Sequence, residues 1–249
     1  MMIELSDVYK TLDGRKILQG LNLSIREGET YVIIGRSGTG KSVTLKNIIG
    51  LMQPDRGEVK IMGQCISQMS KTESYEIRQK MGVLFQSGAL INWLNVEDNV
   101  ALPLTEHKRH LPKSEVVEIV RQKLELVELS HAGKRMPSEL SGGMKKRAGL
   151  ARAIVGGPKI ILYDEPTSGL DPVMSNQIND LIISMQKKLG VTSICVTHDM
   201  SSAYRIANRI GMIFEGKIIE EGTPQEIKNT QNPIVKQFIS GSTVGPLTQ

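Results

Sequence analysis

The feature that most constrains this chain is a glycine-rich loop near its N-terminus. Residues 35–42, GRSGTGKS, match the spacing G-x-x-x-x-G-K-[ST] of a phosphate-binding loop, or P-loop. An apolar stretch at 30–34 precedes the loop and predicts a buried strand, and a helical pattern carrying Leu45, Ile48 and Ile49 follows it. In this setting, backbone N–H groups curl around phosphate oxygens and the helix N-terminus adds partial positive charge. The loop therefore predicts a nucleotide site.

Two side chains at the end of the loop have separate predicted roles. Lys41 is expected to reach the β- and γ-phosphates, and the Ser42 hydroxyl is expected to bind Mg²⁺. The residues predicted to bind nucleotide here are Gly35, Arg36, Ser37, Gly38, Thr39, Gly40, Lys41, Ser42 and Val43.

Further polar side chains follow other predicted strands. Asp164 and Glu165 end the strand at 160–163, at the edge where ligands of open α/β sheets bind. Asp164 is placed to bind the magnesium ion, and Glu165 suits a general base that polarises the attacking water. His198 follows the strand at 192–197 and is expected at the same edge, within reach of the γ-phosphate. Gln86, at the end of another strand, is expected to bind Mg²⁺ or to position water.

A second anion site is predicted about a hundred residues after the first, in LSGGM at 140–144. Ser141 suits the N-cap of a helix, and Gly142 and Gly143 expose backbone N–H groups at its start. The P-loop already holds the phosphates of one nucleotide. A second donor cluster is useful if it caps the nucleotide of another copy, which predicts a head-to-tail homodimer with two ATP molecules between its subunits.

The order of the elements predicts an α/β fold. Continuous apolar strands separated by amphipathic helices indicate a parallel sheet that is covered on both faces. A helix at 115–129 is expected to be capped by Ser114, and another runs from about 140 to 155. A hairpin at 215–216 and a short helix at 224–228 precede a tail. The expected strands lie at 3–8, 17–25, 58–62, 81–85, 159–164 and 192–197.

The composition limits the possible functions. The net charge of +5 is mild, and aromatic residues make up only 4% of the chain, which argues against a stacking surface for single-stranded nucleic acid. No apolar run approaches the ~20 residues that a membrane-spanning helix needs. We therefore expect a chain without a nucleic-acid partner, whose membrane role depends on other subunits.

In this order, the motifs resemble those of the ATP-binding cassette family, from about Ile3 to Lys228. The resemblance implies a RecA-like P-loop core with a mostly parallel sheet, an antiparallel β-subdomain and an inserted helical subdomain. It places an ATPase domain at 1–229, with the core at 1–86 and 157–229 and the helical subdomain at 87–156, followed by a tail at 230–249. It also implies that Asp171, in the segment SGLD at 168–171, communicates across an ATP-driven dimer that works on a membrane permease.

Finer features resemble one branch of that family, the ATPases of MCE-associated lipid transporters of the maintenance-of-lipid-asymmetry type. They are Met144 in place of the usual glutamine, and the segments at 85–90, 96–103 and 233–241. This resemblance implies phospholipid transport between membranes and an MCE-domain subunit beside the permease. It places the chain peripherally on the cytoplasmic face of the inner membrane. A small regulatory subunit on the helical subdomain is left open, as is whether the tail clasps a neighbour or is disordered.

Several alternatives accompany this interpretation. The runner-up is the ATPase of an importer for polar solutes. Chromosome and DNA-repair ATPases need coiled coils or zinc modules in the insert, and the insert has neither heptads nor cysteine clusters. The cations Lys145, Lys146 and Arg147 are expected to form a solvated helix face. The family's adenine-stacking aromatic is replaced by Leu12, and Tyr9 lies out of register, so loose selectivity between ATP and GTP is expected.

Overall fold

The computed structural model describes residues 1–108 and 110–248. Arg109, inside the predicted helical subdomain, and Gln249, at the end of the predicted tail, lie outside the described residues. The chain divides into two compact units, Met1–Ser74 with Thr192–Gln249, and Tyr75–Val191. Among the described residues, no helix is both long and apolar enough to span a membrane.

The first unit contains a mostly parallel group of strands. The central strand β3 (Thr30–Ile34) pairs in parallel with β8 (Thr192–Thr197) and with β9 (Arg209–Phe214). Every residue of β3 and β8 is buried, as expected for parallel strands with both faces covered. A turn at Glu215 and Gly216 then joins β9 to the antiparallel strand β10 (Lys217–Gly222).

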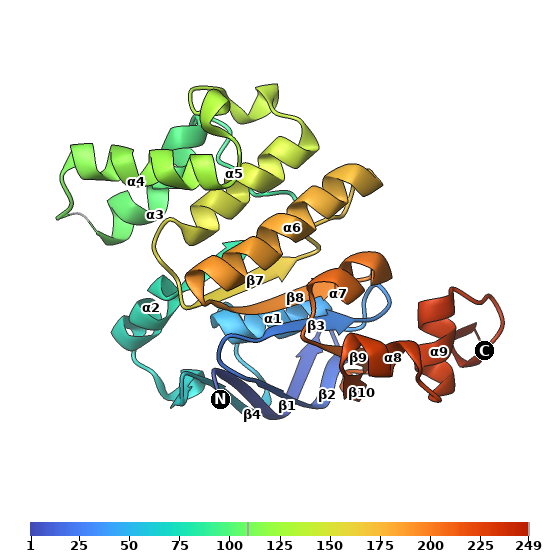
Figure 1. Ribbon diagram of the computed structural model, residues 1–249. Coiled ribbons are helices and arrows are strands. Elements are labelled where there is room, and N and C mark those ends of the chain that lie inside the picture. Colours follow the sequence, from blue (N-terminus) through green and yellow to red (C-terminus); the bar gives the residue numbers. More distant parts are fainter. Residues whose placement is uncertain (109, 249) are drawn as a thin grey trace. The chain divides into compact units, whose positions relative to one another are not determined.

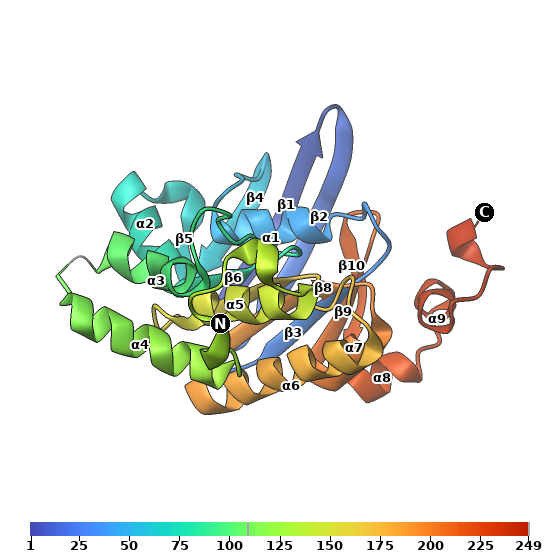
Figure 2. The ribbon, with the colours of Figure 1, turned by 90° about the horizontal axis from the view of Figure 1, so that it is seen from above.

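A second, antiparallel sheet belongs to the same unit and has the strand order β2-β1-β4-β5. Its largest part is the long hairpin of β1 and β2, which is prominent in Figure 2. The strands are β1 (Ile3–Leu12), β2 (Arg15–Ile25), β4 (Arg56–Ile61) and β5 (Gln64–Cys65). The helices of this unit are α1 (Lys41–Ile49), α7 (Met200–Ile206), α8 (Pro224–Lys228) and α9 (Pro233–Ser240), and α2 (Lys71–Gln79) crosses the boundary between the units.

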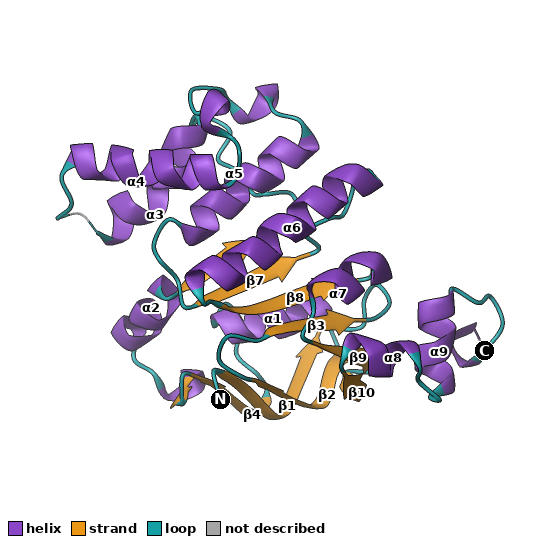
Figure 3. Cartoon of the chain, viewed as in Figure 1, coloured by secondary structure: helices purple, strands orange, loops and turns teal. Residues whose placement is uncertain are grey.

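The second unit is mainly helical (Figure 3). Its two strands, β6 (Met81–Leu84) and β7 (Ile160–Asp164), pair in parallel. Helix α5 (Gly142–Ile154) packs against β6 and against the helices around it, and most of its residues are buried. The other helices are α3 (Val96–His107), α4 (Lys113–Leu126) and α6 (Pro172–Leu189).

The fold is the expected α/β fold with a parallel sheet, an antiparallel sheet and helices, although some local predictions were wrong. Helix α4 begins at Lys113 with Pro112 at its N-cap, so Ser114 lies inside the first turn and does not cap the helix. The same helix ends at Leu126, before Glu128, whose φ of 56° lies in the left-handed region and is incompatible with a continuing helix. The predicted boundaries of the core, the helical subdomain and the tail stay predictions.

The tail segment contains helix α9, which the sequence pattern did not predict. Val235 and Gln237 of α9 are buried. The Gln237 side chain donates to the Ser242 carbonyl at 3.1 Å and accepts from the Leu247 N–H at 2.7 Å, which folds residues 241–248 back against α9. In Figure 1, α8, α9 and the C-terminus form one red-coloured end of the chain.

Candidate functional site

The P-loop motif begins directly after β3 and ends with Lys41 and Ser42, the first two residues of α1. Gly40 occupies the N-cap of α1 with a φ of 104°, a left-handed conformation that favours glycine. At Gly35, a Cβ atom would come within 2.6 Å of the Ile213 carbonyl oxygen, so no side chain fits there. These two glycines let the backbone turn tightly enough to present N–H groups to an anion.

Lys41 is folded over the P-loop and is almost fully buried. Its ammonium donates to the carbonyl oxygens of Gly35, at 2.8 Å, and Arg36, at 3.0 Å. A buried ammonium next to a glycine-rich backbone suits the phosphates of a nucleotide, which are strong acceptors for such a donor. The chemistry of the loop therefore fits ATP.

His198 follows β8 in the same unit as the P-loop. Ile34 of β3 is the register partner of Thr197 of β8, and the two strands are parallel, so Gly35 and His198 leave them at the same edge. His198 is exposed. Asp199 caps α7 by accepting from the Ser201 N–H at 3.0 Å. The structure confirms the predicted edge position of His198 relative to β3.

The second unit brings the other strand-end residues together. Leu84 of β6 is the register partner of Tyr163 of β7, so Gln86 and the pair Asp164 and Glu165 emerge at one edge. The Gln86 amide donates to the Ser168 hydroxyl at 3.2 Å. Glu165 has a φ of 47°, which is an uncommon conformation for a residue other than glycine. Such strain collects at functional sites.

Lys146 was predicted to lie on a solvated helix face, and that prediction was wrong. Only 3% of its surface is exposed. Its ammonium donates to the carbonyl oxygens of Gln86 and Glu165, the latter at 3.1 Å. Burial lowers the pKa of Lys146, while the neighbouring carboxylates of Glu165 and Asp164 act in the opposite direction. Sequence reasoning missed this residue, although the small and apolar residues that follow it on α5 indicate a buried helix.

Arg147, the next cation, is also buried rather than solvated. Its guanidinium donates to the Val127 carbonyl at 2.9 Å, to the Glu128 carboxylate at 2.7 Å and to the Gln177 amide oxygen at 2.9 Å. Of the three cations predicted to be solvated, only Lys145 is partly exposed.

The LSGGM motif forms the start of α5. Ser141 is its N-cap and accepts from the Met144 N–H at 3.3 Å, which confirms the predicted cap. Ser141 and Gly142 are exposed, whereas Gly143 is buried. A Cβ atom at Gly143 would collide with the end of the Met174 side chain, at 2.1 Å. The start of α5 is therefore exposed, as a site that binds the phosphates of a second copy's nucleotide must be.

Asp171 caps a helix, a role that the sequence analysis did not predict. It is the N-cap of α6, and its carboxylate accepts from the N–H groups of Val173, at 2.9 Å, and Met174, at 3.0 Å. The side chain is exposed. Because α6 carries Pro172 at its first position, this cap fixes where the helix begins.

Neither of the two residues considered for adenine stacking offers a free aromatic face: Tyr9 packs against an arginine, and Leu12 is aliphatic. The Tyr9 ring packs under the Arg56 guanidinium, 5.1 Å from the ring centre. Leu12 lies at the end of β1, opposite Arg15 in the hairpin. Neither observation supplies an aromatic platform, so loose base selectivity stays a prediction.

The second unit also contains a groove of about 610 Å³ beside the Gln86 loop. Tyr75 of α2, Phe85, Ile91, Leu102 of α3 and Arg152 of α5 are among the residues that line it. Phe85 is 38% exposed, which is unusual for a phenylalanine that no other chain covers.

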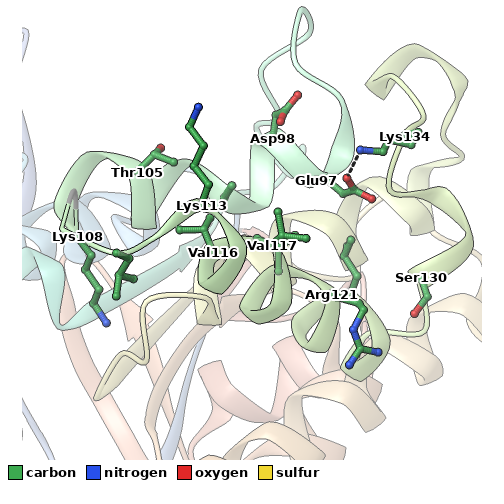
Figure 4. Close-up of a pocket in the computed structure, with 14 residues that line it drawn as sticks. Glu97, Asp98, Thr105, Lys108, Lys113, Val116, Val117, Arg121, Ser130 and Lys134 are labelled. Atoms are coloured by element: carbon green, nitrogen blue, oxygen red, sulfur yellow. Dashed lines mark ion pairs between the residues drawn. The ribbon is translucent and has the colours of Figure 1, made fainter.

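A second cavity, of about 620 Å³, lies between α3 and α4 (Figure 4). Val116 and Val117 of α4 contribute apolar surface, and Glu97 at its rim forms an ion pair with Lys134 at 2.6 Å. This cavity contains none of the predicted nucleotide-binding residues.

The predicted site residues are thus divided between the two units. The P-loop and His198 belong to the first unit, and the others belong to the second, namely Gln86, Ser141, Gly142, Gly143, Asp164, Glu165 and Asp171. Ser42, Gln86 and Asp164 offer hydroxyl, amide and carboxylate oxygens, which are the hard ligands that Mg²⁺ prefers.

Comparison with known proteins agrees with this geometry. The model of the ABC transporter family matches residues 18–168. The intermembrane phospholipid transport ATP-binding protein MlaF of Haemophilus influenzae is 43% identical over 246 residues, which cover 99% of this chain and 93% of that protein. The probable ribonucleotide transport ATP-binding protein mkl of Mycobacterium leprae is 43% identical over 245 residues, which cover 98% of this chain and 70% of that protein.

A solved structure shows the same fold. It is the dimeric, post-hydrolysis state of the ATP-binding cassette MJ0796 bound to ADP and Pi. It aligns with a TM-score of 0.83 and 33% identity over 90% of this chain and 99% of that one. The family model covers more than half of the chain and includes the P-loop, Gln86, the LSGGM motif and Glu165. The chain therefore belongs to the ABC transporter family, as an ATP-binding subunit that hydrolyses ATP.

Proposed function

We propose that this chain energises the transport of phospholipid between two membranes. The observation that carries this proposal is the 43% identity to MlaF of Haemophilus influenzae, which extends over nearly the whole of both chains. The relative named for ribonucleotide transport is equally identical, but this chain covers 70% of it. Transport of a polar solute such as a ribonucleotide is therefore the second candidate.

In the proposed mechanism, the P-loop binds ATP. The residues of this loop, from Gly35 to Val43, surround the phosphates, and Lys41 contacts the β- and γ-phosphates. Ser42, Gln86 and Asp164 would hold Mg²⁺, which supplies positive charge to the transferring phosphoryl group. The buried ammonium of Lys41 and the exposed amide of Gln86 support these assignments.

The proposed chemistry is the attack of water on the γ-phosphorus. Glu165 accepts a proton as the water oxygen bonds to phosphorus, and the bond between the γ-phosphorus and the bridging oxygen breaks to release ADP. Gln86 orients the water, and His198 contacts the γ-phosphate. The position of Glu165 directly after β7, at the edge where Gln86 follows β6, supports its role.

Hydrolysis is proposed to occur in a head-to-tail homodimer. Ser141, Gly142 and Gly143 of one copy would cap the nucleotide that the P-loop of the other copy holds. Asp171 would lie at the same junction. The start of α5 supports this arrangement, because Ser141 and Gly142 are exposed there and a helix N-terminus favours an anion.

The groove beside Phe85 is proposed to receive a cytoplasmic helix of a polytopic permease. An exposed aromatic side chain and a cavity of about 610 Å³ offer apolar surface to such a helix. Since the groove begins next to Gln86, a helix bound in it would shift the conformation of the Gln86 loop. An MCE-domain subunit and a peripheral position on the cytoplasmic face of the inner membrane complete the proposal, and a small regulatory subunit remains a prediction.

The hydrolytic role of Glu165 is tested by Glu165→Gln. The variant should keep its affinity for ATP and form a stable ATP-bound dimer, because closure without hydrolysis traps the pair. Its turnover should fall by about 10²–10⁴, the usual contribution of a general base. Turnover within threefold of wild type, measured with the membrane partners present, would remove Glu165 from the mechanism.

The substrate class is tested by purifying the Glu165→Gln complex from native membranes in the presence of ATP. Mass spectrometry should find a permease, an MCE-domain subunit and tightly held phospholipid. Recovery of a solute-binding protein without an MCE subunit would overturn the lipid proposal in favour of polar-solute transport, and would leave ATP hydrolysis untouched.

A further inference from the structure

Lys146 has no part in the catalytic mechanism proposed above. It lies in the middle of α5, with 3% of its surface exposed, yet it carries a charge. Burying an ammonium costs free energy unless strong acceptors surround it. Its acceptors are the backbone carbonyls of Gln86 and Glu165. A side chain from α5 therefore joins the backbones at the ends of β6 and β7.

The bond to Glu165 acts on a strained residue. With its φ of 47°, Glu165 has a conformation that costs of the order of 1 kcal/mol or more for a residue with a Cβ atom. Its carbonyl accepts from Lys146 at 3.1 Å and from the Ser168 N–H at 3.2 Å. These two donors hold the carbonyl in place, and this constrains the Cα–Cβ bond of the same residue, from which its side chain starts.

The bond to Gln86 belongs to a wider attachment of this loop to α5. Arg152, near the end of the helix, donates to the carbonyls of Gly88, at 2.8 Å, and Ala89, at 2.7 Å. The loop therefore rests on two buried or partly buried cations of one helix. Lys146 is the cation of the two that also bonds to Glu165.

From this geometry we propose that Lys146 is a positioning residue for ATP hydrolysis. Its ammonium ties the Gln86 loop to the Glu165 backbone and thereby aims the Glu165 carboxylate at the attacking water. The inference rests on the proposed role of Glu165 as the general base. It predicts a larger loss of turnover than of nucleotide affinity, since the P-loop, which is proposed to hold the phosphates, contains no residue that Lys146 bonds to.

Three variants of Lys146 distinguish the effect of its hydrogen-bond donors from the effect of its side-chain volume. Lys146→Met keeps the length and removes the donors. Lys146→Gln keeps a polar group but is too short to reach both carbonyls. Lys146→Arg keeps the charge and several donors. The matched control is Lys145→Met, the same change one position earlier, at a partly exposed residue of the same helix.

Steady-state ATPase assays on the purified full-length chain should show a kcat about tenfold lower for Lys146→Met, with a KM within about twofold of wild type, as expected when an interaction acts in the transition state. Lys146→Gln should fall in the same direction, and Lys146→Arg should recover to within about threefold of wild type. Lys145→Met should match wild type. Amide hydrogen exchange should speed up at 86–88 and 165–168 in Lys146→Met alone.

A double mutant separates this inference from the proposed function. If Lys146 acts through Glu165, adding Lys146→Met to Glu165→Gln should slow turnover by less than about twofold more. An equal slowing in both backgrounds would overturn the inference. So would a kcat within twofold of wild type in both Lys146→Met and Lys146→Gln, or an equal loss in Lys145→Met. Normal turnover of Glu165→Gln would instead overturn the role of Glu165 itself.

Discussion

Asn99 should be one of the most costly residues to truncate in the second unit. It is fully buried in α3, and its side chain holds the segment that leads from the Gln86 loop into that helix. Its amide oxygen accepts from the Ile91 N–H at 2.7 Å. Its amide nitrogen lies 3.0 Å from the Ile91 carbonyl, 2.9 Å from that of Leu94 and 3.0 Å from that of Asn95.

The cost of Asn99→Ala follows from the number of these bonds that are lost. An amide nitrogen has two hydrogens, so its three acceptors share two full hydrogen bonds, and the oxygen makes a third. The carbonyl of Asn95 keeps the N–H of residue 99 as a donor, at 2.9 Å. At about 1 kcal/mol net for each bond, Asn99→Ala should lower the free energy of unfolding by about 3 kcal/mol.

Asn95→Ala is the matched control, because it removes the same atoms four residues earlier. The Asn95 side chain makes one capping bond, to the Asp98 N–H at 2.8 Å, so its loss should cost about 1 kcal/mol. Urea unfolding followed by circular dichroism measures both changes. The single tryptophan of the chain, Trp93, lies between the two segments that Asn99 joins, and since it is already 79% exposed, the readout for this segment is its fluorescence anisotropy, which reports local mobility.

Two results would refute this reasoning. One is a loss in Asn99→Ala no greater than that in Asn95→Ala. The other is a Trp93 anisotropy transition that stays at the wild-type urea concentration in Asn99→Ala, because the bonds that are removed hold the tryptophan's own segment.

Three other predictions concern the nucleotide site shared by two copies, the C-terminal tail, and the dependence of stability on pH. Mixing Lys41→Ala subunits with Ser141→Arg subunits should restore about one active site per heterodimer, and an ATPase rate per subunit that is independent of protein concentration would contradict the shared site. Truncation after Phe238 should weaken pairing or complex assembly, as measured by analytical ultracentrifugation, and leave the core folded, with a loss of helical circular dichroism no larger than α9 accounts for. The Lys10 hydrogen bond lowers the pKa of Asp55, so this carboxylate adds stability above about pH 4 that is lost as the pH falls through its folded pKa. Asp55→Asn should therefore lower the urea midpoint at pH 7 more than at pH 3, and equal shifts at both would count against that linkage.

Local signals in the sequence predicted the features whose causes are local. The P-loop spacing and the Ser141 cap each depend on a few adjacent residues, and the structure has both. Strand β8 matched its predicted range because all six of its residues are buried, which makes an uninterrupted apolar pattern. The parallel direction of the strands could be inferred from the same pattern, and the observed register then places His198 and Gly35 at one edge.

Features that depend on distant partners could not be predicted in this way. Lys146 and Arg147 look solvated because lysine and arginine are rarely buried, and their acceptors lie 18 residues or more away along the chain. Pro103 lies inside α3, where a proline normally disfavours a helix, and tertiary packing overrides that preference. The order in the tail depends on Gln237, whose contacts with residues 242 and 247 no periodicity reveals.

One helix connects three of the features to which we assign roles in hydrolysis. Helix α5 starts at the exposed LSGGM motif, bonds to Gln86 and Glu165 through Lys146, and bonds to the Gln86 loop again through Arg152. Its 13 residues span about 20 Å at 1.5 Å for each residue. Because a helix is stiff over this length, an anion bound at its start cannot shift the helix without shifting the carbonyls that Lys146 and Arg152 hold. If the proposed roles hold, movement of an anion bound at the LSGGM motif would be transmitted through α5 to Glu165, the proposed general base.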